Sequence, residues 1–195
     1  MSNAGLVPSM QPGRLLPFLV HLMNLRDPHA RRHSEHVSAL SLALAQSLEL
    51  TTEEQEIIRF AAAIHDIGKL AINDFLMNKP GRFTTPEYLM MQQHALLGAD
   101  MLYKLDLDPR VVSMVLQHHE NFDGSGYPGG NRGDAIPLGA RIIRLADTYD
   151  ALTSNRGYHV ARPAAEAMAI MESVSECFDP ELQEAFNRMR PGRNE

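Results

Sequence analysis

Hydrophobic positions along most of the chain recur at spacings of three and four, which is the period of an α-helix. Between residues 31 and 48, apolar side chains stand at positions 37, 40, 44 and 48 and form one helical stripe. No alternating pattern of useful length indicates a β-strand. The chain is therefore predicted to be all-α, a helical bundle of about seven or eight helices.

Capping motifs indicate where two of these helices begin. Thr51 with Glu54, and Thr84 with Glu87, match the Thr-x-x-Glu pattern of a capping box. Residues 121–133 are rich in Gly, Asn and Asp and are predicted to form a loop, long enough to suggest a functional role. Helices are expected over residues 15–25, 31–48, 51–66, 84–105, 108–119, 136–153, 163–174 and 180–189.

Length and composition describe an ordinary globular chain of 195 residues. We expect residues 1–13 to be tag and linker, and 14–195 to form one domain cut from a longer protein with a sensory or receiver module. One cysteine, Cys177, suits a reducing compartment and excludes a cysteine-built zinc site. A net charge of −6 argues against a nucleic-acid duplex as partner, and no apolar run is long enough for membrane insertion. We predict a cytoplasmic protein.

The first chemical motif is His65-Asp66 at the end of a predicted buried helix, with Lys69 one turn further on. An adjacent histidine and aspartate can serve two metal ions, because a carboxylate has two oxygens and can bridge. Lys69 could meet a phosphate oxygen. Taken alone, the motif is explained more simply as a capped helix end.

Other histidines and one aspartate stand at comparable positions. His118 and His119 point about 100° apart on a helix, so both can reach a cluster at the helix end. Asp147 lies on the apolar face of its predicted helix, where an aspartate needs a partner or a metal. His33 and His94 fall within helices. Each residue also has a structural explanation, as a solvated helix end, a salt-bridged aspartate or a core histidine.

Considered together, these residues favour a metal site. Imidazoles and carboxylates without thiolates suit iron, manganese, nickel or zinc in hydrolytic centres. Two such metals roughly 3.5–4 Å apart can clamp a phosphoryl group. The set therefore predicts a central metal cluster that acts on a phosphate ester.

Over about residues 14–190 the sequence resembles the HD-GYP family of the HD phosphohydrolase superfamily. The motif from His118 to Pro128 is the most specific part of the resemblance, whereas the His-Asp pair alone would not be. Five stretches carry it in order: residues 33–37 (HSEHV), 65–69 (HDIGK), His94 with Gly98, residues 118–128 (HHENFDGSGYP), and Ile136-Pro137 followed by residues 141–156.

The resemblance implies a helical fold around a metal cluster that hydrolyses cyclic di-GMP to pGpG, GMP or both, through a hydroxide that bridges the metals. It implies two or three divalent ions, most often iron or manganese, with nickel or zinc also compatible. Asp66 would bridge the metals and Lys69 would steady the scissile phosphate, which makes both catalytic. The implied metal ligands are His33, His65, Asp66, His94, His118, His119 and Asp147.

The resemblance also implies contacts with the substrate. Gly126, Tyr127 and Pro128 would shape the rim of the pocket, and Lys69 and Arg156 would contact the nucleotide.

Three positions depart from the usual family pattern. His36 stands where an arginine is common, which changes a peripheral ion pair. His159 stands where a second basic nucleotide contact is common, so substrate binding would be weaker or pH-dependent. His29 stands one helical turn before His33 and is a candidate ligand for a third metal.

Two other functions stay open. One is a nucleotidase of the same superfamily, against which the Gly-Tyr-Pro loop argues. The other is a catalytically weak or silent signalling module that binds a diguanylate cyclase or other signalling domains, against which the complete set of ligand positions argues. A purely structural bundle would need seven polar residues at these positions by accident.

Overall fold

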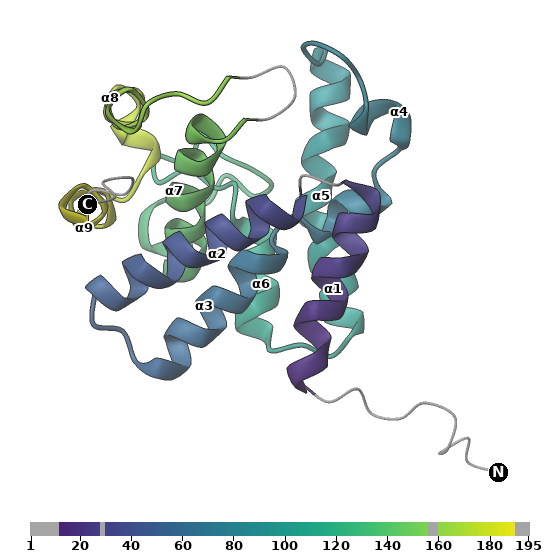
Figure 1. Ribbon diagram of the computed structural model, residues 1–195, viewed down its shortest axis with the longest axis horizontal. Coiled ribbons are helices and arrows are strands. Elements are labelled where there is room, and N and C mark those ends of the chain that lie inside the picture. The colour runs from purple at the N-terminus through teal and green to yellow at the C-terminus, as the bar shows by residue number, and fades with distance from the viewer. Residues whose placement is uncertain (1–11, 28–29, 156–159, 190–195) are drawn as a thin grey trace.

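The computed structural model describes residues 12–27, 30–155 and 160–189. Helices joined by loops make up these residues and no strand occurs among them, so the predicted all-α fold is confirmed (Figure 1). Three short 3-10 helices are η1 (Ile67–Ala71), η2 (Gly133–Ala135) and η3 (Ser175–Cys177). The α-helices in these ranges are α1 (Pro12–Arg26), α2 (Ala30–Ser47), α3 (Thr52–Ile64), α4 (Asp74–Met77), α5 (Thr85–Lys104), α6 (Pro109–Gln117), α7 (Leu138–Thr153), α8 (Ala164–Glu172) and α9 (Pro180–Met189).

The helices begin where their capping residues predicted. At the start of α3, the Thr51 backbone N–H donates to Glu54 Oε2 at 2.9 Å and the Glu54 N–H donates back to Thr51 Oγ1 at 3.3 Å. Thr84 and Glu87 form the same box before α5. Two differences from the prediction are the short helix α4, which has no apolar period of its own, and the start of α1, which includes residues 12 and 13.

Helix α2 lies at the centre of the packing and contacts α1, α3, α7 and α9. It contributes side chains to both of two apolar clusters. One joins α1, α3, α5 and α6 and includes the fully buried Ile64, and the other joins α2 to α7, α8 and α9 around Phe186. Burying these side chains is the main favourable contribution to folding, and it fixes the ends of α3 and α6 beside α7.

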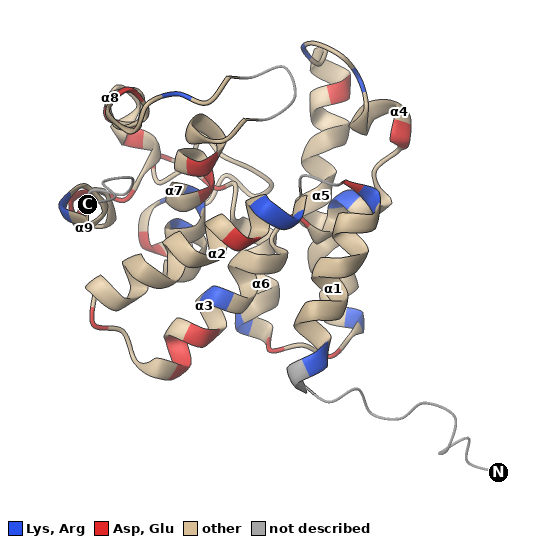
Figure 2. Ribbon diagram, viewed as in Figure 1, with Lys and Arg blue, Asp and Glu red and all other residues tan. Residues whose placement is uncertain are grey.

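Charged residues of both signs are spread over the helices. Lys and Arg are interspersed with Asp and Glu over most of the helices in Figure 2. Among the described residues, no helix combines the length and the apolar character that a membrane span requires.

The closest approach between η1 and α5 depends on two glycines. A Cβ built on Gly68 would lie 1.9 Å from the carbonyl oxygen of His94 and 2.4 Å from the backbone nitrogen of Gly98. Both obstacles are backbone atoms, so neither can rotate away. This contact brings the segment that follows α3 against the middle of α5.

We predict that Gly68→Ala lowers the free energy of unfolding by about 3 kcal/mol or more, because the methyl group must push two backbones apart. Gly139→Ala is the matched control, since the three atoms nearest to its Cβ would belong to side chains, two at the flexible end of Met114 and one in Ile58, and none to the backbone. Urea denaturation measures both variants. Equal, small losses of stability would contradict the role given to the contact between η1 and α5.

Candidate metal centre

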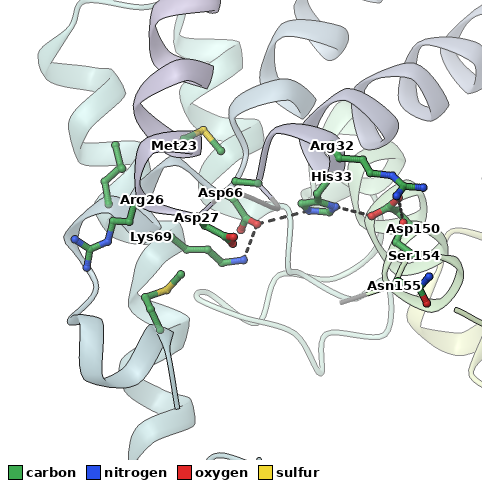
Figure 3. A pocket seen from close by; sticks show the side chains of 13 residues that line it. Met23, Arg26, Asp27, Arg32, His33, Asp66, Lys69, Asp150, Ser154 and Asn155 are labelled. Atoms are coloured by element: carbon green, nitrogen blue, oxygen red, sulfur yellow. Dashed lines mark hydrogen bonds and ion pairs between the residues drawn. The ribbon is translucent and has the colours of Figure 1, made fainter. Parts of the chain in front are cut away.

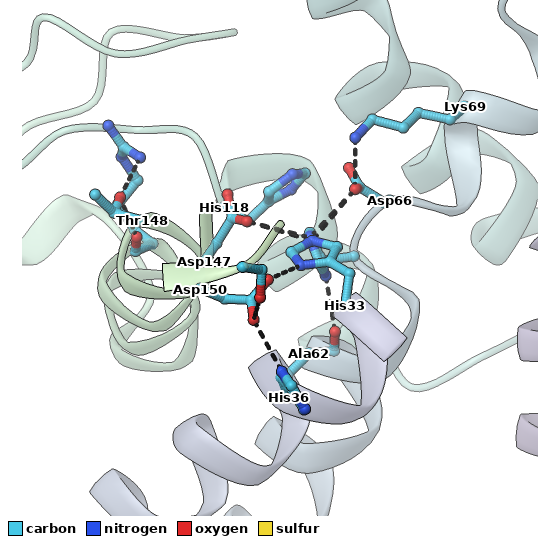
Figure 4. A network of polar contacts seen from close by, with 12 residues as sticks. His33, His36, Ala62, Asp66, Lys69, His118, Asp147, Thr148 and Asp150 are labelled. Carbon is cyan, nitrogen blue, oxygen red and sulfur yellow. Dashed lines mark hydrogen bonds and ion pairs between the residues drawn. The ribbon is translucent and has the colours of Figure 1, made fainter. Parts of the chain in front are cut away.

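The predicted ligands come from five helices and converge on one point. His33 lies on α2, His94 on α5 and Asp147 on α7. His65 is the C-terminal cap of α3 and His118 the C-terminal cap of α6, so the chain turns away just after each of them. The structure thus brings together all seven residues, and Figure 4 shows His33, Asp66, His118 and Asp147 of this group.

The imidazole nitrogens face one another. His33 Nε2 lies 3.2 Å from His65 Nε2, and His94 Nε2 lies 3.3 Å from His118 Nε2. His119 lies beside the second pair, because its ring centroid is 4.1 Å from that of His118. The centre therefore has two halves, one around His33 and His65 and one around His94, His118 and His119.

The other ring nitrogen of three histidines is held by the main chain of the preceding turn. Nδ1 of His65 lies 2.8 Å from the Ala62 carbonyl oxygen. The corresponding distances are 2.7 Å for His94 to Met91 O and 2.7 Å for His118 to Val115 O. A carbonyl oxygen only accepts, so each Nδ1 must donate its hydrogen.

This fixes the tautomer of each neutral ring and leaves a lone pair on Nε2. The lone pairs of His94 and His118 therefore point at each other across 3.3 Å, an arrangement that is repulsive unless a cation lies between them. The donor set, which is all imidazole and carboxylate, fits divalent transition metals. The residues present therefore fit the cations that the sequence predicted.

Asp66 lies between the two halves. Its Oδ2 is 3.6 Å from His33 Nε2 and 3.5 Å from His65 Nε2, while its Oδ1 is 3.4 Å from His94 Nε2. Each half therefore receives one oxygen of the same carboxylate, which is the geometry expected of a bridging ligand.

Asp147 belongs to the half around His33. Its Oδ1 lies 3.3 Å from His33 Nε2 and 4.0 Å from His65 Nε2. The two halves thus differ in charge, because Asp66 is shared and Asp147 adds a second carboxylate on one side only.

Sequence reasoning missed one carboxylate near the centre. Asp150, one turn after Asp147 on α7, accepts from His33 Nδ1 at 2.7 Å and lies 3.1 Å from His36 Nδ1. The spacing of three between Asp147 and Asp150 places both on one helix face, and that was the available signal.

The electrostatics of the centre keep most of its histidines neutral. Burial lowers the pKa of His65 and His94, and it lowers the pKa of His118 and His119 well below the ordinary value, with the neighbouring imidazoles acting in the same direction. Neutral imidazole is the form that binds a metal.

His33 and Asp66 are charged in the absence of a cation. Burial opposes the charge on His33, but its hydrogen bond to Asp150 and its attraction to the carboxylates of Asp66 and Asp147 outweigh burial and raise its pKa to about 9. Burial also raises the pKa of Asp66, but Lys69 and the imidazoles outweigh it and hold that pKa well below its usual range.

The Gly-Tyr-Pro segment folds back over the second half. The Tyr127 ring stacks on His119 with centroids 4.7 Å apart, and its backbone N–H donates to the His119 carbonyl oxygen at 3.1 Å. Gly126 permits this approach, because a Cβ there would lie 2.3 Å from the backbone nitrogen of Asn121. Glu120 Oε1 accepts from the Gly129 N–H at 2.6 Å and secures the turn. The Tyr127-Pro128 peptide bond is cis.

A cavity adjoins the centre on the side of α1 (Figure 3). Lys69 lies in its wall and donates to Asp66 Oδ2 at 2.6 Å. Met23, Leu70 and Met77 also line the cavity and supply apolar surface. The cavity thus offers an apolar wall and a cation next to the bridging carboxylate.

Three predicted contacts lie outside the described residues. They are the third-metal candidate His29 and the nucleotide contacts Arg156 and His159.

Comparison with known proteins identifies the family. The pattern of the HD domain family matches residues 17–182. The chain belongs to the HD domain family. This match spans the whole metal centre and confirms the relationship that the motifs indicated.

Two curated relatives of this HD domain are named as phosphodiesterases. A cyclic di-GMP phosphodiesterase of Pseudomonas aeruginosa is 40% identical over 171 residues, which is 86% of this chain and 41% of the relative. A 3'3'-cGAMP-specific phosphodiesterase of Vibrio cholerae is 37% identical over 168 residues, again 86% of this chain and 36% of the relative. The HD domain thus spans less than half the length of either relative.

A solved structure supports the fold. The HDG"Y"P protein of Bdellovibrio bacteriovorus superposes with a TM-score of 0.71 at 23% identity, covering 92% of this chain and 61% of that one. At that identity the likeness concerns the arrangement of helices alone.

We predict that the stability of the metal-free HD domain peaks between about pH 6.5 and pH 7.5 and falls on both sides of this range. Below about pH 6.5 several histidines of the centre bind protons in the unfolded chain but stay neutral in the folded protein, so the free energy of unfolding falls. They are His65, His94, His118 and His119. His33 acts oppositely, because its raised pKa stabilises the folded state at low pH, and this contribution decreases as the pH rises from about 6.5 and is lost by about 9.

Thermal unfolding of chelator-treated protein at several pH values checks this prediction. His118→Gln should make the melting temperature fall less steeply on the acid side, since it removes one histidine that stays neutral in the folded protein. A melting temperature that does not change between pH 5.5 and 7.5 (a range chosen to span the ordinary histidine pKa) would contradict it.

Proposed function

We propose that this chain is the hydrolase domain of a metal-dependent phosphodiesterase that opens cyclic di-GMP. The observation that carries the proposal is the pair of Nε2 lone pairs of His94 and His118 facing each other at 3.3 Å, beside a carboxylate shared by both halves of the centre. The names of the curated relatives support the substrate class.

The seven converging residues would hold two divalent cations. His33, His65 and Asp147 would serve one cation, His94, His118 and His119 the other, and Asp66 would serve both. Such a pair supplies a nucleophile from water near neutral pH and stabilises negative charge on a phosphoryl group. The protein's part is to orient these ligands, and the Nδ1 hydrogen bonds of His65, His94 and His118 do this for three of them.

Lys69 would act on the substrate. Its ammonium group lies 2.6 Å from Asp66 Oδ2, at the edge of the cavity and next to the bridging carboxylate. Positive charge fixed there can stabilise the charge that develops on the phosphate oxygens during cleavage.

Tyr127 would orient the nucleotide on the opposite side. It is stacked on His119 and edge-to-face with Tyr88, whose ring centroid is 6.4 Å away. Aromatic faces bind purine bases by stacking, without strong selection among bases. Gly126 and Pro128 would shape the same rim, and we retain Arg156 and His159 as proposed nucleotide contacts.

The metals would be iron or manganese, with His29 as a candidate ligand for a third ion. The full-length protein would act in the cytoplasm in signal transduction, with other signalling domains, including diguanylate cyclases, as partners.

A second substrate is favoured by a specific observation. A relative of comparable identity is named for 3'3'-cGAMP, a cyclic dinucleotide with the same phosphodiester linkages. We therefore expect the domain to cleave 3'3'-cGAMP as well as cyclic di-GMP, and both faster than a mononucleotide.

The activity is tested with anaerobically purified protein that contains manganese or iron. Cyclic di-GMP, 3'3'-cGAMP and a nucleoside monophosphate are supplied in turn, and products are separated by chromatography. We predict linear pGpG or GMP from cyclic di-GMP. Hydrolysis of the monophosphate alone would favour a nucleotidase, and binding of cyclic di-GMP without turnover in metal-containing protein would favour a silent signalling module.

Asp66→Asn should lower kcat for cyclic di-GMP at least about 1,000-fold, because it removes the charge shared by both halves. Asp100→Asn is the control, since that exposed aspartate pairs only with Lys104 on the surface of α5. An Asp66→Asn protein with nearly normal turnover would refute the proposed mechanism.

Lys69→Gln should lower kcat/KM for cyclic di-GMP by roughly 100-fold while the metal content stays unchanged. The reason is that Lys69 faces the substrate side of Asp66 and contributes no ligand. Kinetics and elemental analysis of the same preparation measure the two effects. Loss of metal in parallel with activity would assign Lys69 to the metal centre instead of the substrate.

A further inference from the structure

The histidines of the centre are held in two different ways. Nδ1 of His65, His94 and His118 donates to a carbonyl oxygen three residues earlier, so each of these rings is anchored by its own helical turn. Nδ1 of His33 donates instead to Asp150 Oδ2 at 2.7 Å, a residue that is 117 positions away in the sequence. The orientation of His33 therefore depends on the packing of α2 against α7.

Asp150 is itself fixed on several sides. Its carboxylate is 1% exposed, and its Oδ1 accepts from Ser154 Oγ at 2.7 Å. His36, one turn after His33 on α2, lies 3.1 Å from the same oxygen and is partly exposed. A buried carboxylate that receives hydrogen bonds on both oxygens is a rigid acceptor, as Figure 4 shows for His33, His36 and Asp150.

Two aspartates one turn apart on α7 thus contact the two ring nitrogens of His33. Asp147 Oδ1 approaches His33 Nε2 at 3.3 Å, and Asp150 Oδ2 holds Nδ1. A carboxylate that accepts from the far nitrogen of a ligating histidine orients the ring and makes it a stronger electron donor. Among the four predicted metal ligands whose Nδ1 contacts are described above, His33 alone has a carboxylate there.

Building on the proposed function, we propose that Asp150 is a positioning residue that sets the metal affinity of the half around His33, separately from the half around His94, His118 and His119. His36 and Ser154 support it by holding its Oδ1. The centre thus contains two inequivalent metal sites, and the one near His33 is tuned from a helix that lies across the interface.

The test is titration of metal-free protein with Mn²⁺, followed by calorimetry and by competition with a chelator. The wild-type protein should bind Mn²⁺ in two classes of site. Asp150→Asn keeps the volume but removes the charge, and should weaken one class about 10- to 100-fold while leaving the other nearly unchanged. Asp179→Asn is the matched control, because Asp179 is also a buried carboxylate but pairs with Arg141 and caps α9, and it should leave both classes unchanged.

A double-mutant cycle assigns the weakened class to His33. In a His33→Gln background, Asp150→Asn should have no further effect on Mn²⁺ binding. In a His119→Gln background it should have its full effect on the class that remains. If Asp150 merely supported the fold, its replacement would act equally in both backgrounds.

Three outcomes would overturn the inference. They are an Asp150→Asn protein that binds both Mn²⁺ classes as the wild type does, one that weakens both classes equally, and equal effects in the two backgrounds. If Asp150→Asn does not fold, His36→Ala and Ser154→Ala replace it, and unchanged affinity in both would also overturn the inference. A wild-type protein that binds no Mn²⁺ would instead count against the proposed function.

Discussion

The metal centre depends on the fixed orientation of three imidazole rings, those of His65, His94 and His118. Main-chain carbonyl oxygens accept hydrogen bonds from Nδ1 of His65, His94 and His118. These bonds fix the orientation of each ring, so the Nε2 lone pairs face one another. Lone pairs that face each other across 3.3 Å are stabilised by a cation and by little else. Everything around them, from the burial that keeps the rings neutral to the shared carboxylate of Asp66, follows from that requirement.

The helical bundle meets the requirement through its helix ends. Apolar burial fixes α3 and α6 so that their C-terminal caps, His65 and His118, meet beside α5 and α7. The contact between Gly68 and Gly98 then draws η1 onto α5 and places Asp66 next to His94. The core is therefore also the scaffold of the chemistry, and a small residue at the right place matters as much as a ligand.

The sequence predicted the helices well, because period and capping are local properties. Thr51 and Thr84 begin helices as their boxes indicated, whereas α4 is too short to carry a period. The family resemblance predicted which residues would meet, but spacing alone left each with a structural explanation. Asp150 was missed because its partner His33 is remote in the sequence and only the packing of α2 against α7 joins them. A contact between residues so far apart in the sequence cannot be predicted from the periodicity of hydrophobic positions.

The most direct test of the account is the location of metal in the folded protein. Crystals grown with Mn²⁺ and measured at the manganese absorption edge would give an anomalous map of every bound ion. The account predicts two peaks, one within the group of His33, His65, Asp66 and Asp147, and one within the group of Asp66, His94, His118 and His119. Well-ordered histidines in the positions described, without a peak between them, would contradict it.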